Sequence, residues 1–128
     1  MMVKGIGVDI IEIQRIRESI EKTNHRFVEK VFTATEVEYC MAKHDPAQHF
    51  AARFAAKEAV SKALATGWSG EFRWKDVEVT NDLLGRPEIS LYGKLRTAVG
   101  RARILVSLSH SMTHVVAMAI IEDPAPCD

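Results

Sequence analysis

The chain has little cysteine, no net charge and no long apolar run. Each of these absences excludes some classes of protein. Its two cysteines, Cys40 and Cys127, lie far apart, which does not indicate a disulfide framework or a zinc site. Lys and Arg total 17, as do Asp and Glu, so no overall field draws the chain to nucleic acid or to an anionic membrane. We expect any acidic partner to meet a local basic patch.

The sequence has no run of about 18 apolar residues and no pattern of a secretory signal. We therefore expect a cytoplasmic protein with no membrane partner. Its 128 residues, 47% hydrophobic and 27% charged, fit one globular domain with a substantial core. We place this domain at residues 1–122 and expect residues 123–128, which include two prolines, to form a flexible tail.

The order of the expected elements indicates a single-domain α+β fold, with an antiparallel sheet of a few strands packed against helices. The last strand is nearly all apolar, so we expect it in the centre of the sheet with both faces buried. Alternating residues predict strands at Met2–Asp9, Lys75–Thr80, Glu88–Leu91, Arg103–Ser109 and His114–Ile121. Helical spacing predicts helices at Ile10–Lys22, Thr33–Lys43, Phe50–Thr66 and Tyr92–Gly100.

Several short signals refine this outline. Asp9 is well placed as the N-cap of the first helix, with Glu12 completing a capping box. Thr33–Glu36 is a second capping-box signature. Gly5 and Gly7 weaken the first strand, and glycines in a strand often mark the close approach of another backbone or of a ligand.

The Ala-rich stretch Phe50–Thr66 has apolar residues on almost every side, which predicts a helix buried on most of its circumference. Glu58 and Lys62 lie one turn apart on it. A carboxylate and an ammonium in an apolar setting are costly unless they are paired, hydrated or ligated. The spacing alone favours a plain ion pair worth a few tenths of a kcal/mol, and a functional site is the alternative.

Asp9, Glu58, Lys62 and His110 are weak signals when taken separately, and the pattern alone does not bring them together. A strand-end aspartate and a mid-helix glutamate could hold Mg²⁺, which proteins bind through one or two carboxylates plus substrate phosphates. A lysine one turn from that glutamate could neutralise a phosphate. The residues therefore allow a phosphoryl-transfer site. The loop His44–His49 lacks metal-ligand spacing, and we expect no metal there.

Five segments recur in the order of a known family. They are Gly5–Asp9, the TATE region after Arg26-Phe27, Arg53–Ala63, Gly85–Pro87 and Ser107–His110. In these segments the chain resembles holo-[acyl-carrier-protein] synthase, the short, single-domain type of 4′-phosphopantetheinyl transferase. The block RFAAKEAVSKA is highly specific, whereas GVD or SLSH alone would mean little. The resemblance covers about residues 3–122 and implies the fold of that family.

The resemblance implies a Mg²⁺-dependent reaction in which a serine hydroxyl of apo acyl carrier protein attacks the β-phosphorus of coenzyme A. Adenosine 3′,5′-bisphosphate leaves, and the holo carrier protein serves fatty acid biosynthesis. The matching positions make Asp9 and Glu58 the metal-binding carboxylates and Lys62 the catalytic lysine beside the pyrophosphate. Either Glu58 or a metal-bound water takes the serine proton. The positions similar to coenzyme-binding residues are Arg53, Lys57, Lys62, Gly85, Arg86, Pro87 and His110.

The resemblance also implies two kinds of protein partner. Arg15, Lys22 and Arg26 form the local basic cluster, and most such clusters are simply solvated surface. Because acyl carrier proteins are acidic around the modified serine, these residues are expected to dock that surface and to raise the association rate. Members of the family are commonly homotrimers with the coenzyme site in the cleft between neighbours.

Two other classes of function remain as alternatives. One is a non-catalytic module that binds coenzyme A or a nucleotide, and the other is a trimeric packing protein with a surface Glu58–Lys62 pair. Retention of Asp9, Glu58 and Lys62 together disfavours the first, because a binding module has little need of the whole set.

Overall fold

The computed structural model describes residues 2–65, 70 and 72–124. The expected end of the central helix beyond residue 65, and residues 125–128 of the expected tail with Cys127, lie outside the described residues. In chain order the elements are β1 (Met2–Glu12), α1 (Ile13–Lys22), α2 (Arg26–Val31), α3 (Ala34–Met41), α4 (Pro46–Leu64), η1 (Trp74–Asp76), β2 (Val77–Asn81), β3 (Pro87–Leu91), α5 (Gly93–Val99), β4 (Arg103–His110) and β5 (His114–Asp123).

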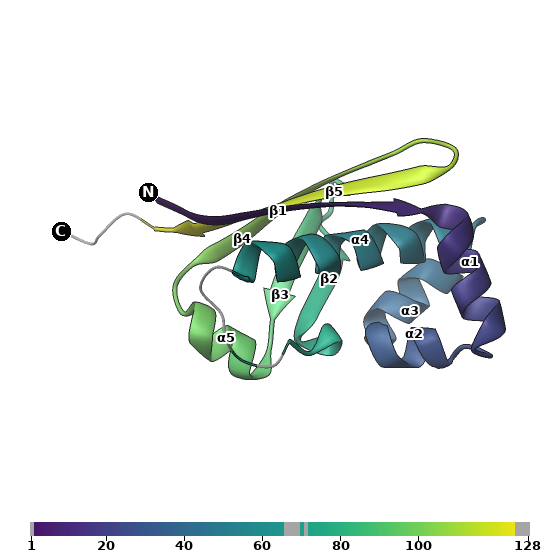
Figure 1. The fold of residues 1–128 in the computed structure, drawn as a ribbon, viewed down its shortest axis with the longest axis horizontal. Helices are drawn as coiled ribbons and strands as arrows, with labels where there is room; N and C mark the ends of the chain where they lie inside the picture. Colours follow the sequence, from purple (N-terminus) through teal and green to yellow (C-terminus); the bar gives the residue numbers. More distant parts are fainter. Residues whose placement is uncertain (1, 66–69, 71, 125–128) are drawn as a thin grey trace.

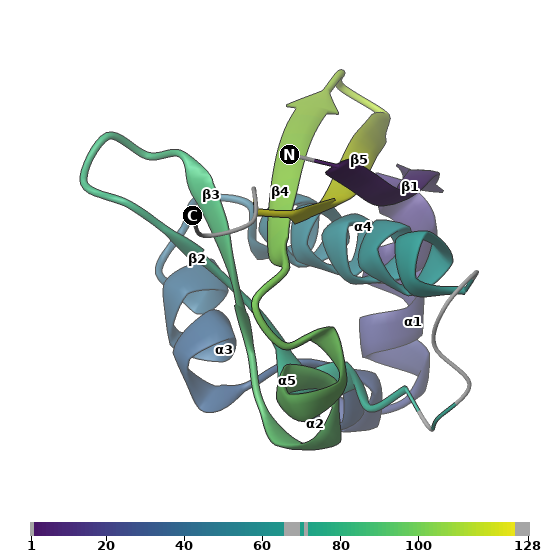
Figure 2. The ribbon, with the colours of Figure 1, turned by 90° about the vertical axis from the view of Figure 1, so that its left-hand side faces the viewer.

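The strands form an antiparallel sheet in the order β1-β5-β4 and a separate antiparallel hairpin of β2 and β3. The long helix α4 runs along one face of the three-stranded sheet, and α1, α2 and α3 gather at one end of it (Figure 1). The end view in Figure 2 shows the hairpin beside the sheet, with α5 below. The predicted α+β fold with an antiparallel sheet against helices is confirmed. No helix within the described ranges has both the length and the apolar character that a membrane span requires.

The two glycines of β1 allow it to lie directly on the backbone of α4. A Cβ atom on Gly7 would stand 2.0 Å from the carbonyl oxygen of Ala59 and 2.7 Å from the amide nitrogen of Ala63. A Cβ atom on Gly5 would stand 2.1 Å from the carbonyl oxygen of Ala63. No side chain fits at these distances, so the expectation of a close backbone approach is confirmed.

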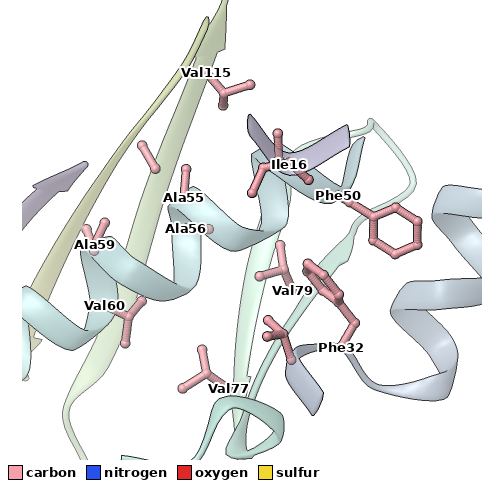
Figure 3. Packing of buried hydrophobic residues seen from close by; sticks show 14 of the residues in the cluster. Ile16, Phe32, Phe50, Ala55, Ala56, Ala59, Val60, Val77, Val79 and Val115 are labelled. Carbon is pink, nitrogen blue, oxygen red and sulfur yellow. The ribbon is translucent and has the colours of Figure 1, made fainter. Parts of the chain in front are cut away.

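Helix α4 is buried on most of its circumference, as predicted, because it packs against both sheets. Ala55 and Ala59 are fully buried on α4, as are Val77 and Val79 on the hairpin (Figure 3). Phe50 continues the core toward the other helices, and its ring centroid lies 4.9 Å from that of Phe32. Each fully buried large apolar side chain stabilises the fold by about 1.5–3 kcal/mol.

The capping box expected at Asp9 is wrong. Strand β1 pairs with β5 as far as Glu12, opposite His114, and α1 begins only at Ile13. Glu12 is the N-cap residue and makes no side-chain capping bond. The strand extends further than its local sequence indicates because the ladder with β5 supplies partners for its backbone groups.

The second capping box is confirmed at the start of α3. Thr33 accepts a hydrogen bond from the Glu36 amide, and the Glu36 side chain accepts one from the Thr33 amide at 2.9 Å. The central helix begins earlier than expected. The Asp45-Pro46 pair that signals a turn is the start of α4, since proline suits the first helical turn.

The prediction that the last strand is buried on both faces is wrong for the single chain. Strand β5 is central, and Val115, Ala117 and Ala119 face α4 and are buried, but the opposite face of the sheet is exposed. The strand also includes Asp123, which the sequence placed in the tail. We call the exposed surface the outer sheet face, and its large apolar residues are Ile6, Val8, Ile10, Leu105, Val116 and Met118.

Candidate active site

Asp9 and Lys62 meet where β1 crosses α4. The Asp9 side chain is 12% exposed, and its Oδ1 atom accepts a hydrogen bond of 2.9 Å from the Lys62 ammonium. Lys62 also donates to the carbonyl of Val8 at 3.0 Å. The other carboxylate oxygen of Asp9, Oδ2, is buried and has no hydrogen-bond partner among the described residues. Because buried carboxylate oxygens normally have partners, Oδ2 marks a place for a cation or a donor.

Glu58 on α4 is partly buried and lies close enough to Asp9 and Lys62 to interact electrostatically with both. Burial raises the pKa of Glu58, the negative charge of Asp9 raises it further, and Lys62 lowers it. The two carboxylates therefore lie within electrostatic reach of each other. Two such groups tolerate each other when a proton or a cation is shared between them.

The plain Glu58–Lys62 pair favoured by spacing alone is not formed. Among the described residues the ion-pair partner of Lys62 is Asp9, which lies 53 positions away in the sequence. The close approach of β1 explains the change. Gly7 lies against α4, and the side chain two residues later points to the same face of the strand. Asp9 is thereby placed beside the side of α4 that carries Glu58 and Lys62.

The residues fit a divalent cation only with help from a substrate. The described part of the chain contains no group of three His, Cys, Asp or Glu side chains able to hold an ion by themselves. Asp9 and Glu58 provide carboxylate oxygens as hard ligands, and Asp9 Oδ2 has no hydrogen-bond partner among the described residues. Mg²⁺ is commonly bound in this way, through one or two carboxylates together with substrate phosphates and water.

A family model described as the 4′-phosphopantetheinyl transferase superfamily matches residues 5–119. The chain belongs to this superfamily. It is 45% identical over 126 residues to a curated protein of Geobacter sulfurreducens named holo-[acyl-carrier-protein] synthase, which covers 96% of this chain and 100% of that protein. The family predicted from the sequence is confirmed.

Solved structures of the same family have the same fold. The holo-(acyl-carrier-protein) synthase of Bacillus anthracis, in complex with CoA (3′,5′-ADP), matches with a TM-score of 0.80 and 34% identity, covering 97% of this chain and 100% of that one. The holo-[acyl-carrier-protein] synthase of Neisseria meningitidis matches with a TM-score of 0.85 and 31% identity, covering 95% and 100%.

Lys57 must be removed from the expected coenzyme-binding residues. Its side chain is fully buried, and its ammonium lies 2.7 Å from Glu36 Oε1 in the protein core. Successive side chains on a helix diverge by about 100°, so Lys57 points away from the side that carries Glu58. The family motif places these two residues next to each other in sequence but does not show that only one faces the site.

Arg53 and His110 lie apart from the carboxylate pair. Arg53 donates to Asn81 Oδ1 at 2.8 Å, and its buried Nε has no partner among the described residues. It precedes Glu58 by five residues, which turns its side chain about 140° around α4. His110 contacts Gln48, ten residues before Glu58 and thus about 15 Å away along the helix axis. One chain therefore does not bring the expected nucleotide residues to the carboxylates.

Gly85, Arg86 and Pro87 form the tip of the β2–β3 hairpin. Gly85 has a φ of 85°, and Arg86 pairs with Asp82 at 3.0 Å. Hydrogen bonds from the Arg86 and Leu84 amides hold the pKa of Asp82 below its usual value. The tip follows Asn81, the partner of Arg53, so it lies on the Arg53 side of the molecule.

The structure adds a basic cluster that the sequence did not indicate. Tyr39 is its centre: Lys43 Nζ lies 4.4 Å from the ring centroid, the Arg53 guanidinium 4.0 Å, and the His49 ring 6.0 Å. Burial lowers the pKa of His49, as do the charges of Lys43 and Arg53. The only sequence signal was the density of basic residues around Asp45, which does not identify Tyr39 as their common platform. We call these four residues the Tyr39 cluster.

The expected carrier-protein contacts are all exposed: Arg15 and Lys22 lie on α1, and Arg26 is the first residue of α2. None of them forms an ion pair with a described residue, whereas Arg17 pairs with Asp45 at 3.2 Å. The three charges are therefore available to an acidic partner.

Proposed function

We propose that this chain transfers the 4′-phosphopantetheine group of coenzyme A to a serine of an apo acyl carrier protein, with Mg²⁺ as the metal. The observation that carries the proposal is that Asp9 on β1 lies beside Glu58 and Lys62 on α4. The Oδ2 atom of Asp9 is buried there without a hydrogen-bond partner among the described residues. Relatives of nearly the same length are named for this reaction, and one was solved with coenzyme A.

In this proposal Asp9 and Glu58 would hold Mg²⁺, whose positive charge would offset the negative charge that develops during transfer. Lys62, whose side chain is 54% exposed, can turn from Asp9 to the pyrophosphate and stabilise the leaving group. The serine oxygen forms a bond to the β-phosphorus as the bond to adenosine 3′,5′-bisphosphate breaks. The serine proton passes to Glu58 or to a water molecule beside it.

We propose in addition that copies of the chain assemble through the outer sheet face into a homotrimer. A contiguous exposed apolar patch of this kind marks an interaction site. Assembly would also allow Arg53, Arg86 and His110 of one copy to approach the carboxylate pair of its neighbour, which they do not reach within one chain. The Tyr39 cluster would then contact the phosphates of the coenzyme. Cytoplasmic location and a role in fatty acid biosynthesis remain predictions from the sequence.

The transfer is tested by mass spectrometry of the carrier protein. Incubation of apo acyl carrier protein with coenzyme A, Mg²⁺ and the purified chain is expected to add one phosphopantetheine group. Reactions with a chelator, or with a carrier protein whose modified serine is alanine, are the controls and should show no gain. Coenzyme binding with no mass gain on any carrier protein would instead favour the non-catalytic binding module.

Reversing the charge of Arg15 is expected to weaken carrier-protein binding. Arg15→Glu should slow association about tenfold at low salt, because exposed charges steer acidic partners. The difference should shrink as salt shortens the screening length. Surface plasmon resonance over a range of salt concentrations measures this, with Lys94→Glu on α5 as the matched control. Equal association rates for Arg15→Glu and the parent at every salt concentration would remove α1 from the docking surface.

A further inference from the structure

Lys57 is a buried charge that the proposed reaction does not use. Its side chain has no exposed surface, and its ammonium donates to Glu36 Oε1 at 2.7 Å, to the carbonyl of Val31 at 2.8 Å and to that of Trp74 at 3.1 Å. A lysine ammonium has three donors, so all of them are used. Burial lowers the pKa of Lys57, and the Glu36 carboxylate opposes that effect.

Glu36 extends this contact to other elements. It is also fully buried, and it accepts hydrogen bonds from the amide of Thr33 at 2.9 Å and from the amide of Val79 at 2.8 Å. The pair therefore ties α4 to the end of α2, the start of α3, η1 and β2. These contacts are directional, and a buried charge left without its partner is strongly unfavourable.

The side of α4 that packs on the three-stranded sheet, away from this pair, has less directional contacts. The buried residues on that side include Ala55, Ala56, Ala59 and Ala63. Such small side chains set the distance between the layers, but they resist rotation of the helix about its axis only weakly. Lys57 immediately precedes Glu58, and a rotation of α4 by one residue would move Glu58 about 100° away from Asp9. A polar contact on the core side of the helix would prevent this.

We propose that the buried Lys57–Glu36 pair is a positioning device that fixes α4 so that Glu58 and Lys62 face Asp9. This inference rests on the proposed function for its catalytic meaning. It predicts that loss of the pair weakens the cation site even in molecules that remain folded. Partners that hydrogen-bond directly to metal ligands change metal affinity by about 10–100-fold, and for a pair that acts through the helix we expect the lower end of this range.

The test removes both charges together, because Lys57→Met alone would leave Glu36 buried without its partner. In Lys57→Met/Glu36→Gln, the binding of Mn²⁺ in the presence of coenzyme A is measured by electron paramagnetic resonance, under conditions where circular dichroism shows a folded protein. We expect affinity at least about tenfold weaker and a similar loss in kcat, with KM for carrier protein within about twofold of the parent. The control, Lys4→Met/Asp123→Asn, removes an exposed ion pair of 3.4 Å on β1 and β5 and should change neither quantity.

Unchanged Mn²⁺ affinity and kcat in the folded double variant would overturn the inference and leave the pair a purely structural contact. If the double variant does not fold, Glu36→Asp decides by the same measurements, since it keeps both charges but shortens the carboxylate arm. Absence of transfer by the parent chain itself would count against the proposed function, while the Mn²⁺ titration would still decide the positioning role.

Discussion

Glu58→Gln is expected to lower the rate of phosphopantetheine transfer by about 10³-fold while leaving the fold intact. The substitution keeps the size of the side chain and removes the charge that would hold the cation or accept the serine proton. Because burial and Asp9 raise the pKa of Glu58, the folded state disfavours the carboxylate relative to the unfolded chain. At neutral pH the variant should therefore be at least as stable as the parent. Mass spectrometry gives the rate, and urea unfolding gives the free energy of unfolding.

The pH dependence provides an internal check. A raised acid pKa lowers stability only as the pH rises through the interval between the unfolded and folded values. The stability difference between Glu58→Gln and the parent should thus vanish below about pH 4.5, the ordinary pKa of the group, and appear toward neutral pH. Glu38→Gln, at an exposed position of α3, is the control and should alter neither rate nor stability. Normal turnover by Glu58→Gln would falsify the role assigned to Glu58.

Two inactive variants are expected to restore activity to each other when they are co-expressed. Glu58→Gln lacks the cation site, and Arg86→Ala/His110→Ala lacks expected coenzyme contacts. If each site combines one residue set from one copy with the other set from its neighbour, a mixed oligomer contains some intact sites. Random assembly in equal amounts places the right copy on each side of about a quarter of the interfaces. Specific activity near a quarter of the parent value is therefore expected.

The activity recovered by co-expression should depend on assembly through the outer sheet face. Met118 is 40% exposed there, on the central strand. Adding Met118→Glu to both variants would bury a carboxylate in the proposed interface, so sedimentation should show single chains and the recovered activity should disappear. Adding Ala98→Glu, at an exposed apolar residue of α5, should leave the recovered activity unchanged. Mixtures that stay inactive although they assemble would mean that each site lies within one chain.

Local features of the fold were predictable from the sequence because short-range physics decides them. The Thr33–Glu36 capping box depends on residues three apart, and the strands of the hairpin depend on alternation and a turn. Gly5 and Gly7 could be interpreted as a close approach because few other reasons place two glycines in a strand. The family resemblance then supplied the association of Asp9 with Glu58, which no local pattern contains.

What could not be predicted depends on residues distant in the sequence. Asp9 looks like a helix cap, but pairing with β5, more than 100 positions away, continues the strand through it. Lys57 and Glu58 are neighbours in a functional motif, yet the position of Glu36 decides that Lys57 lies in the core. A nearly all-apolar strand can have both faces buried within one chain, or it can have one face exposed, as β5 does. The sequence of the strand does not distinguish the two arrangements.

The contact between β1 and α4 also limits which side chains α4 can carry. Where strand backbone rests on helix backbone, the helix has space for a methyl group and little more, so the abundance of alanine in α4 reflects interlayer spacing as well as helix propensity. Larger apolar residues at Ala59 or Ala63 would lift the strand away from the helix. Since that strand carries Asp9, a change made to fill the core would separate the two acids on which the chemistry depends.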